Sequence, residues 1–231
     1  MGPIRTWLRR SLWEVVPRDH REAPRALRRR QWVTSAFAIV GAVALGLSLR
    51  IEPGSPSFYP ATLALAAVWV VGAFASGPLH LGRIGLRTGL VRPTVSPVAL
   101  GLALAGVFVL GALVVRELPY LGGRVAGVLD YADQGSLPVL VVITAVNGVA
   151  EELFFRGALY AAVTRRPVLW TTLAYTLVTL ATGNVMLAGA AAVLGVVVGL
   201  ERRASGGILA PVLTHVTWSL TVLLALPPLF A

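Results

Sequence analysis

The chain has 231 residues, of which 56% are hydrophobic and 13% charged, and its mean hydropathy is +0.78. Soluble domains lie nearer half apolar and a quarter charged, so this composition excludes an ordinary soluble enzyme and indicates an integral membrane protein. There is no cysteine, which excludes disulfides and thiolate metal sites. All 20 basic residues are arginine and the net charge is +10. Together with the excess of Ala, Gly, Val and Leu, the arginine usage favours a GC-rich bacterial genome.

A basic arm opens the chain, with nine arginines in residues 1–31. Such a density also suits nucleic-acid binding, but a membrane segment follows at once. A basic stretch beside a span is the usual positive-inside signal and attracts anionic lipid, so we predict no nucleic-acid partner. Apolar residues at helical spacing predict an interfacial amphipathic helix, with a flexible tail as the alternative. These residues are Ile4, Trp7, Leu8, Leu12 and Val15.

Seven stretches after the arm are apolar over about the 20 residues that a transmembrane helix needs. They lie near residues 32–50, 58–79, 95–115, 137–155, 168–184, 185–200 and 208–227. The first follows a long basic preface and no convincing cleavage site closes it, so we interpret it as a retained anchor. The connector at 116–136 is expected to be a solvated loop, and the turn at Thr182–Asn184 is very short.

The distribution of arginine across the connectors predicts the orientation. With the N-terminus in the cytoplasm, 17 arginines fall on the inner side and only Arg50, Arg116 and Arg124 on the outer side. Arginine is enriched in cytoplasmic loops. We therefore predict an all-α, polytopic protein with about seven transmembrane helices and a cytoplasmic N-terminus, in the cell (plasma) membrane.

Charged residues interrupt the fourth span, in the stretch NGVAEELFFRG at residues 147–157. A charge at membrane depth costs at least about 2.5–3.5 kcal/mol, so it persists when it is paired or required by function. Glu152 and Arg156 are four residues apart with the acid first, the better order for a helical ion pair. Glu151 is turned about 100° away from that pair. It has no partner in its own sequence neighbourhood, so it is a candidate general base or metal ligand.

Two further polar clusters occur in the C-terminal spans. In LTHVTWSL, His215 and Ser219 are four residues apart and share a helix face. A lone histidine in a helix is more often structural, but its occurrence together with Glu151 favours a catalytic role here. The other cluster is the turn at Thr182–Asn184, where asparagine is also a common turn residue.

These stretches resemble the CPBP family of intramembrane endopeptidases, which includes the type II CAAX prenyl proteases and bacterial immunity-type relatives. EELFFRG fits the first family motif, Glu-Glu-x-x-x-Arg followed by Gly, and GGILAPVLTHVTWSL is similar to the last motif helix. The resemblance covers about residues 137–223. Together with the charge and apolar patterns, it predicts a basic arm at 1–31, three family-variable helices and an outer loop at 32–136, and a CPBP-like core of four transmembrane helices at 137–231.

Roles for individual residues follow from this resemblance. Glu151 matches the catalytic glutamate that activates water. Glu152 and Arg156 match the supporting pair. His215 matches the histidine of the third motif, which orients the water or a metal ion and helps to stabilise the oxyanion.

Two positions depart from the family pattern. The second motif is Phe-x-x-x-His, and at the expected spacing Asn184 stands in place of the histidine; a register at Val178 and Thr182 is the alternative. Ser219 replaces the closing Asn of the third motif. A zinc site would keep only Glu151 and His215 with weak oxygen ligands, so the cofactor is left open between a divalent metal such as zinc and none. Asn184 and Ser219 are then expected to act as hydrogen-bond donors.

We therefore expect an intramembrane endopeptidase that hydrolyses a peptide or membrane-protein substrate, with Glu151 as general base. CAAX processing is not expected in a bacterium, so the substrate stays open. A second hypothesis, motivated by Asn184 and Ser219, is a catalytically degenerate CPBP-fold scaffold or regulator. A third is a proton-coupled transporter with Glu151 and His215 as the relay. No inverted repeat is evident, which counts mildly against transport.

Overall fold

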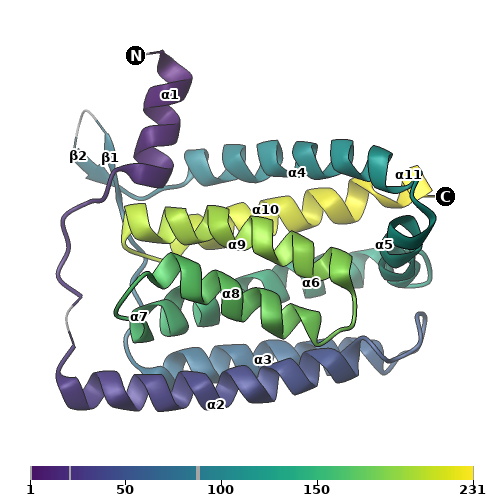
Figure 1. The fold of residues 1–231 in the computed structure, drawn as a ribbon, viewed down its shortest axis with the longest axis horizontal. Coiled ribbons are helices and arrows are strands. Elements are labelled where there is room, and N and C mark those ends of the chain that lie inside the picture. Colours follow the sequence, from purple (N-terminus) through teal and green to yellow (C-terminus); the bar gives the residue numbers. More distant parts are fainter. Residues whose placement is uncertain (1, 21, 87–88, 231) are drawn as a thin grey trace.

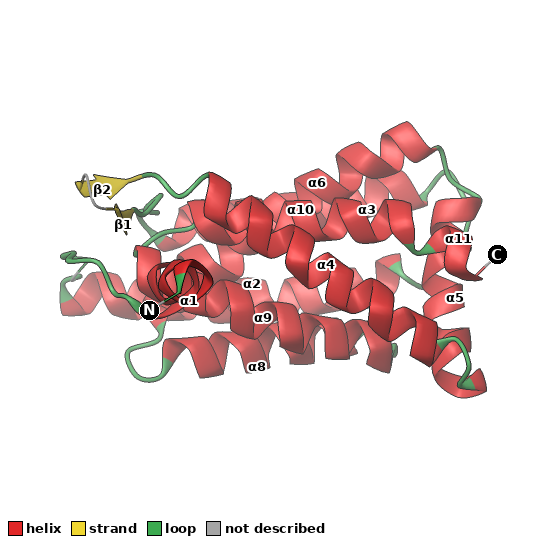
Figure 2. Ribbon diagram, turned by 90° about the horizontal axis from the view of Figure 1, so that it is seen from above, coloured by secondary structure: helices red, strands yellow, loops and turns green. Residues whose placement is uncertain are grey.

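A bundle of long helices makes up most of the computed structural model, which describes residues 2–20, 22–86 and 89–230 (Figure 1). Figure 2, turned by 90°, shows that these helices run roughly along one common direction. The bundle helices are α2 (Pro24–Ser48), α3 (Phe58–Ser76), α4 (Val95–Val115), α6 (Leu137–Glu152), α8 (Pro167–Leu180), α9 (Val185–Ser205) and α10 (Leu209–Ala225).

Each of the seven predicted spans coincides with a helix. Five helical segments are long and apolar enough to cross a bilayer, namely Pro24–Ser48, Phe58–Ser76, Val95–Val115, Leu137–Ala162 and Val185–Ser205. Helices α8 and α10 are also apolar but have only 14 and 17 residues. The all-α class is confirmed, and the helices have the composition of a membrane protein. The number of crossings and the side of each terminus stay predictions.

The connector at 116–136, expected to be a solvated loop, instead contains a helix, α5 (Pro119–Asp133). Proline at the first helical position favours the start of a helix there. Leu129 faces inward and joins a small apolar cluster with Ala112 and Leu226. The Tyr131 hydroxyl donates hydrogen bonds to backbone carbonyls that follow α2. The loop prediction missed this helix because its buried face is contributed by only a few residues.

The basic arm is helical at its start. Helix α1 (Pro3–Leu8) continues into a π-helical turn, η1 (Arg9–Trp13). The axis of α1 crosses the bundle direction, because α1 stands upright in Figure 1 and is seen end-on in Figure 2. Leu12 is buried, whereas the side chains of Ile4 and Trp13 are exposed. This geometry suits a helix lying along a membrane surface, which stays a prediction.

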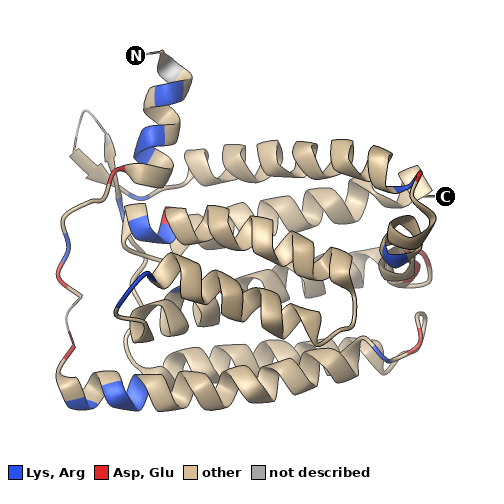
Figure 3. Ribbon diagram, viewed as in Figure 1, with Lys and Arg blue, Asp and Glu red and all other residues tan. Residues whose placement is uncertain are grey.

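Most blue positions of the ribbon in Figure 3, which mark arginine, lie at the end of the bundle that carries α1 and the hairpin of β1 (Ile84–Leu86) and β2 (Gly89–Val91). Arg50 and Arg116 follow the C-terminal ends of α2 and α4, and Arg124 lies in α5, all at the opposite end. Arg21 and Arg87, counted on the inner side, lie outside the described residues. The segregation of charge thus follows the pattern on which the predicted orientation is based.

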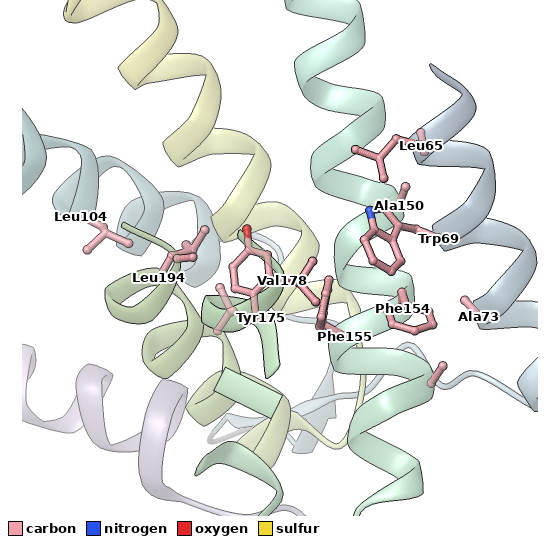
Figure 4. Packing of buried hydrophobic residues seen from close by; sticks show 14 residues of the cluster. Leu65, Trp69, Ala73, Leu104, Ala150, Phe154, Phe155, Tyr175, Val178 and Leu194 are labelled. Atoms are coloured by element: carbon pink, nitrogen blue, oxygen red, sulfur yellow. The ribbon is translucent and has the colours of Figure 1, made fainter. Parts of the chain in front are cut away.

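An aromatic core holds the EELFFRG segment against α3. The ring of Trp69 lies 4.7 Å from that of Phe154 and 5.1 Å from that of Phe155, measured between centroids. All three side chains are almost fully buried, and Figure 4 shows them packed between α3 and the segment that continues α6. In a bilayer the lipid is as apolar as this core, so close packing of the three rings, and not their removal from water, fixes the rotation of the segment that carries the two glutamates.

The basic arm contacts the bundle through two stacked histidine rings, His20 of the arm and His80 after α3. The rings of His20 and His80 lie 3.7 Å apart and 6° from parallel. Partial burial, His80, Arg202 and Arg18 together lower the pKa of His20 to about 4, against an opposing effect of Asp19. Burial is also the main cause that lowers the pKa of His80, followed by Arg202 and Arg30, with Glu22 opposing them. Both rings are therefore neutral at neutral pH.

Docking of the arm is expected to weaken as the pH falls from about 6.5 towards about 4. In that window a histidine of the undocked arm binds a proton, whereas a histidine of the stacked pair does not. Docking therefore becomes more stable as the pH rises. A histidine NMR titration checks this, because the chain has only three histidines. In the His80→Ala variant the pKa of His20 is expected to move up towards about 6.5. A His20 that titrates near 6.5 in the unmodified protein would contradict the prediction.

Candidate active site

The two glutamates lie where the α-helix changes its winding. Helix α6 passes after Glu152 into a seven-residue π-helical segment, η2 (Leu153–Leu159), which leads into α7 (Tyr160–Ala162). π-helical turns are rare and are frequent at functional sites. Phe154 and Phe155 of this segment are buried in the aromatic core. The charged groups of Glu151 and Glu152, at the end of α6, and of Arg156, in η2, contact one another or residues of α8 and α10.

Glu152 lies at the centre of a buried polar cluster. Arg156 Nη1 donates a hydrogen bond to Glu152 Oε1 at 3.0 Å, so the ion pair expected from the spacing is present. His215 Nδ1, from α10, lies 2.8 Å from the same oxygen. The side chains of Glu152 and Arg156 are fully buried and His215 is nearly so. Glu152 is thus held by one cation and one imidazole.

Glu151 has a different partner, which the sequence neighbourhood does not contain. The hydroxyl of Tyr175, in α8, donates a hydrogen bond to Glu151 Oε2 at 2.6 Å. The Arg156 guanidinium carbon lies 4.6 Å from the centroid of the Tyr175 ring, within cation–π range. Glu151 is only partly buried, whereas Glu152 is fully buried. Of the two glutamates, Glu151 is thus the less buried residue.

The contact with Glu152 also indicates which ring nitrogen of a neutral His215 carries the proton. A carboxylate accepts hydrogen bonds, so the proton of a neutral His215 is on Nδ1, which donates to Glu152. No hydrogen bond of Nε2 is found within the described part of the chain. The His215 ring centroid lies 6.4 Å from that of Tyr175. Nε2 is therefore the ring atom free to accept a hydrogen bond from a water molecule near Glu151.

Asn184 is a helix cap and does not join this cluster. Its Oδ1 accepts hydrogen bonds from the backbone N–H groups of Met186 and Leu187, at 2.9 and 3.3 Å, at the start of α9. Its Nδ2 donates to the carbonyl oxygen of Arg124 at 2.7 Å. Asn184 therefore does not donate a hydrogen bond to the polar cluster, contrary to the role expected for it from the sequence. The turn between α8 and α9 lies at the end of the bundle, and its asparagine serves as an N-cap.

Ser219 and the alternative second-motif register also lie apart from the hydrogen bonds of the glutamates. Ser219 Oγ donates to the carbonyl oxygen of His215, one turn back in α10, at 2.8 Å. Thr182 Oγ1 donates to the carbonyl oxygen of Thr179 at 2.7 Å. Val178 packs in the apolar core. The polar residue that α8 does contribute is Tyr175, which lies before both registers.

Substitution of Asn184 by alanine is expected to lower the free energy of unfolding by about 0.5–2 kcal/mol, the usual cost of removing an N-cap. Asn184→Asp is the matched control, because a carboxylate still accepts the two backbone hydrogen bonds. Thermal unfolding in detergent measures both variants. We expect no change in catalytic turnover for either. A loss of turnover at unchanged stability would return Asn184 to the site.

Two residues near the cluster escaped the sequence analysis. Tyr175 was hidden within an apolar span, and a hydroxyl-bearing aromatic in such a span is the signal that could have identified it. Glu201, in α9, is almost fully buried and forms no ion pair with the described residues, and the Thr214 hydroxyl lies near its carboxylate without ideal hydrogen-bond geometry. Its position next to Arg202 made it look like part of a charged helix end. In fact Arg202 donates to the carbonyl oxygen of Arg156 at 2.6 Å.

The donor set does not fit a catalytic zinc ion. Among the described residues, no three His, Cys, Asp or Glu side chains gather closely enough to hold a metal. Glu152 Oε1 already accepts two hydrogen bonds, and His215 contributes the only imidazole in the cluster. Catalytic zinc sites use three protein ligands with a fourth position for water. The site is therefore better suited to activating a water molecule with protein groups than with a zinc ion.

An apolar cavity of about 460 Å³ lies between α4, α5, α9 and α10. Its lining includes Met186 and Leu187 at the start of α9 but none of the residues of the polar cluster. Trp218, which forms part of its wall, connects the two regions, because the centroid of its ring lies 6.0 Å from that of His215.

Residues 133–221 match the family model described as Type II CAAX prenyl endopeptidase Rce1-like. The matched segment contains Glu151, Glu152, Arg156, Tyr175 and His215. No curated protein and no solved structure matches the chain. The resemblance inferred from the motifs is confirmed for this segment, which is that of a family of membrane proteases.

Proposed function

We propose that this membrane protein is an intramembrane endopeptidase in which Glu151 acts as the general base. One observation carries the proposal: the two adjacent carboxylates have different partners. Glu152 is neutralised by Arg156 and held by His215, whereas Glu151 accepts a hydrogen bond from a neutral phenol, Tyr175, and remains partly accessible. A partly accessible carboxylate held in a fixed orientation is suited to accepting a proton from water.

The proposed reaction begins with a water molecule next to Glu151. Glu151 removes a proton from this water, and the water oxygen attacks the carbonyl carbon of the scissile peptide bond. The electron pair of the carbonyl moves to its oxygen. When the tetrahedral intermediate collapses, the C–N bond breaks and the proton held by Glu151 passes to the leaving nitrogen. The products are a carboxylic acid and an amine, and transfer of the acid proton to the amine gives a carboxylate and an ammonium group.

The other groups have supporting roles in this proposal. Tyr175 positions the Glu151 carboxylate, and Nε2 of His215 accepts the second water proton as a hydrogen bond. Glu152 keeps the His215 proton on Nδ1, and Arg156 offsets the charge of Glu152. In a water-excluded site such preoriented groups contribute more than they do in water.

A peptide or a segment of a membrane protein is the proposed substrate. The apolar cavity of about 460 Å³ falls in the range of ligand-binding cavities and is lined mainly by aliphatic side chains. It would hold apolar residues of the substrate, with Trp218 between them and the polar cluster. We place the protein in the bacterial plasma membrane, with the basic arm on the anionic inner leaflet.

Mapping of new N-termini tests the proposal. The full-length protein is reconstituted with a bacterial membrane-protein extract, and the fragments are compared with those from Glu151→Gln. We expect new N-termini, lying in apolar segments, only with the unmodified protein. If neither protein produces them, the degenerate scaffold replaces the protease. Flux of a solute driven by a pH gradient in the same vesicles would instead favour the transporter.

A further inference from the structure

A second cavity, of about 520 Å³, lies at the bundle end that carries the basic arm. Four separate segments contribute to its walls: Val16–Arg18 and His20 of the arm, Leu79–Arg83 after α3, Leu90 and Arg92 of the hairpin, and Ser205–Gly206 at the end of α9. It is distant in sequence from the glutamates, and the protease proposal makes no use of it.

The lining of this cavity is basic. Arg18, Arg83 and Arg92 contribute to the walls together with His20 and His80, and no acidic side chain is among the described lining residues. Asp19, next to His20, makes its own interaction nearby. The guanidinium group carries donors in a planar fork that matches the oxygens of a phosphate. The cavity therefore offers several N–H donors and excess positive charge to an anion.

Backbone contacts hold the walls of the cavity in place. Arg83 N donates to the carbonyl oxygen of Ser205 at 2.8 Å, and Ile208 N to that of His80 at 2.9 Å. A Cβ atom on Gly207 would lie 2.0 Å from Gly82 N, so only glycine permits this close crossing. The connector after α3 is thereby joined to the end of α9. Binding would not need to order these two walls.

Two of the arginines are oriented by the same backbone. Arg18 Nη1 donates to the carbonyl oxygen of Arg203 at 2.7 Å, and Arg92 Nη1 to that of Gly82 at 2.6 Å. Each contact occupies one of the five N–H groups of a guanidinium. The Arg83 side chain makes no hydrogen bond or ion pair with the described residues. All three guanidinium groups thus keep donors for a ligand.

The position of the cavity favours a lipid as the source of the anion. It opens at the ends of α3 and α9, where apolar helices give way to charged segments, as at the surface of a bilayer. Helix α1, which crosses the bundle direction nearby, leaves Ile4 exposed. Exposed Trp13 follows it in η1. Apolar side chains beside a basic cavity match acyl chains beside a headgroup.

We propose that this cavity binds the phosphate group of an anionic phospholipid. The phosphodiester would be held by Arg18, Arg83 and Arg92. Its chains would lie along the apolar surface of α1 and η1. The inner leaflet of a plasma membrane, to which the predicted orientation assigns this end, carries such anionic lipids. The proposal does not depend on peptide-bond hydrolysis, and loss of either property would leave the other intact.

Native mass spectrometry of the full-length protein tests the proposal. Protein from vesicles with equal amounts of phosphatidylglycerol and phosphatidylcholine is expected to retain phosphatidylglycerol preferentially. Arg83→Gln removes one guanidinium that has no structural contact. We expect it to lower this retention about fivefold, the effect of about 1 kcal/mol for one basic residue near an anionic surface. Arg50→Gln, an exposed arginine at the other end, is the matched control and should change nothing.

Three results would overturn the proposal. Equal losses in Arg83→Gln and Arg50→Gln would show diffuse attraction instead of a site. Retention without preference for phosphatidylglycerol would exclude an anionic headgroup. In a third arm, inorganic phosphate is added while the NMR signals of His20 and His80 are followed. Saturation by free phosphate, without retention of lipid, would assign the cavity to a soluble phosphate.

Discussion

Glutamine in place of Glu151 is expected to lower peptide-bond hydrolysis by about 10²–10⁴-fold, the usual contribution of a general base. The amide has nearly the same shape, and its oxygen can still accept the hydrogen bond of Tyr175, so the fold should be retained. It cannot take a proton from water. Initial rates of cleavage, normalised to folded protein in vesicles, measure the effect.

Two further variants serve as comparisons for Glu151→Gln, one as a control and one to test the positioning role of Tyr175. Glu117→Gln changes a carboxylate in an exposed ion pair with Arg116, outside the bundle core, and should leave the rate unchanged. Tyr175→Phe removes the hydrogen bond from a phenol to the Glu151 carboxylate, and a hydrogen bond to a charged group is worth about 1.5–3 kcal/mol, so a loss of about 10- to 150-fold is expected. If Glu151→Gln cleaves as fast as the unmodified protein, Glu151 is not the base and the proposed mechanism fails.

Alanine in place of Glu152 is expected to lower the free energy of unfolding by about 3–5 kcal/mol, because it leaves a buried cation uncompensated. Arg156 is fully buried, and its Nε and Nη2 atoms already have no hydrogen-bond partner among the described residues. The substitution also removes the acceptor of His215 Nδ1. Thermal or denaturant unfolding in detergent measures the loss, and cleavage should fall with it.

Glu201 provides the matched control for this second prediction. It is as buried as Glu152, but it forms no ion pair with the described residues, and only the Thr214 hydroxyl lies near its carboxylate. Glu201→Met keeps the length of the side chain and removes a buried carboxyl group that has no cation beside it, so it should cost much less stability than Glu152→Ala. Equal destabilisation by Glu152→Ala and Glu201→Met would mean that loss of any buried carboxyl group, and not loss of the ion pair, lowers stability.

The double variant Glu152→Met with Arg156→Met separates charge from packing. Replacing both members of a buried ion pair with apolar side chains is often neutral or stabilising, whereas removing one is costly. We therefore expect the double variant to be more stable than either single variant. A double variant whose loss is the sum of the two single losses would indicate that the two side chains act independently.

Much of the helix arrangement followed from local sequence. An apolar run of sufficient length predicts a helix whatever surrounds it, so all seven bundle helices were located, and the short turn at Thr182–Asn184 was located as well. The Glu152–Arg156 pair was predictable for the same reason, because four residues of helix bring the two side chains together. The family match over residues 133–221 was also foreseeable, because the motifs that carry it are local in the sequence. By contrast α5 was missed, since a helix with few buried residues has a weak pattern.

The partners of the polar groups could not be inferred in this way. Tyr175 meets Glu151 across 24 residues, and His215 meets Glu152 across 63. Such contacts depend on the rotation and depth of each helix in the bundle, which the apolar pattern of a membrane span leaves undefined because nearly every face is apolar. Asn184 suited both a cap and a catalytic donor by residue type. Its position at the start of α9 gave it the two N–H groups that it binds, and helix packing kept it away from the glutamates.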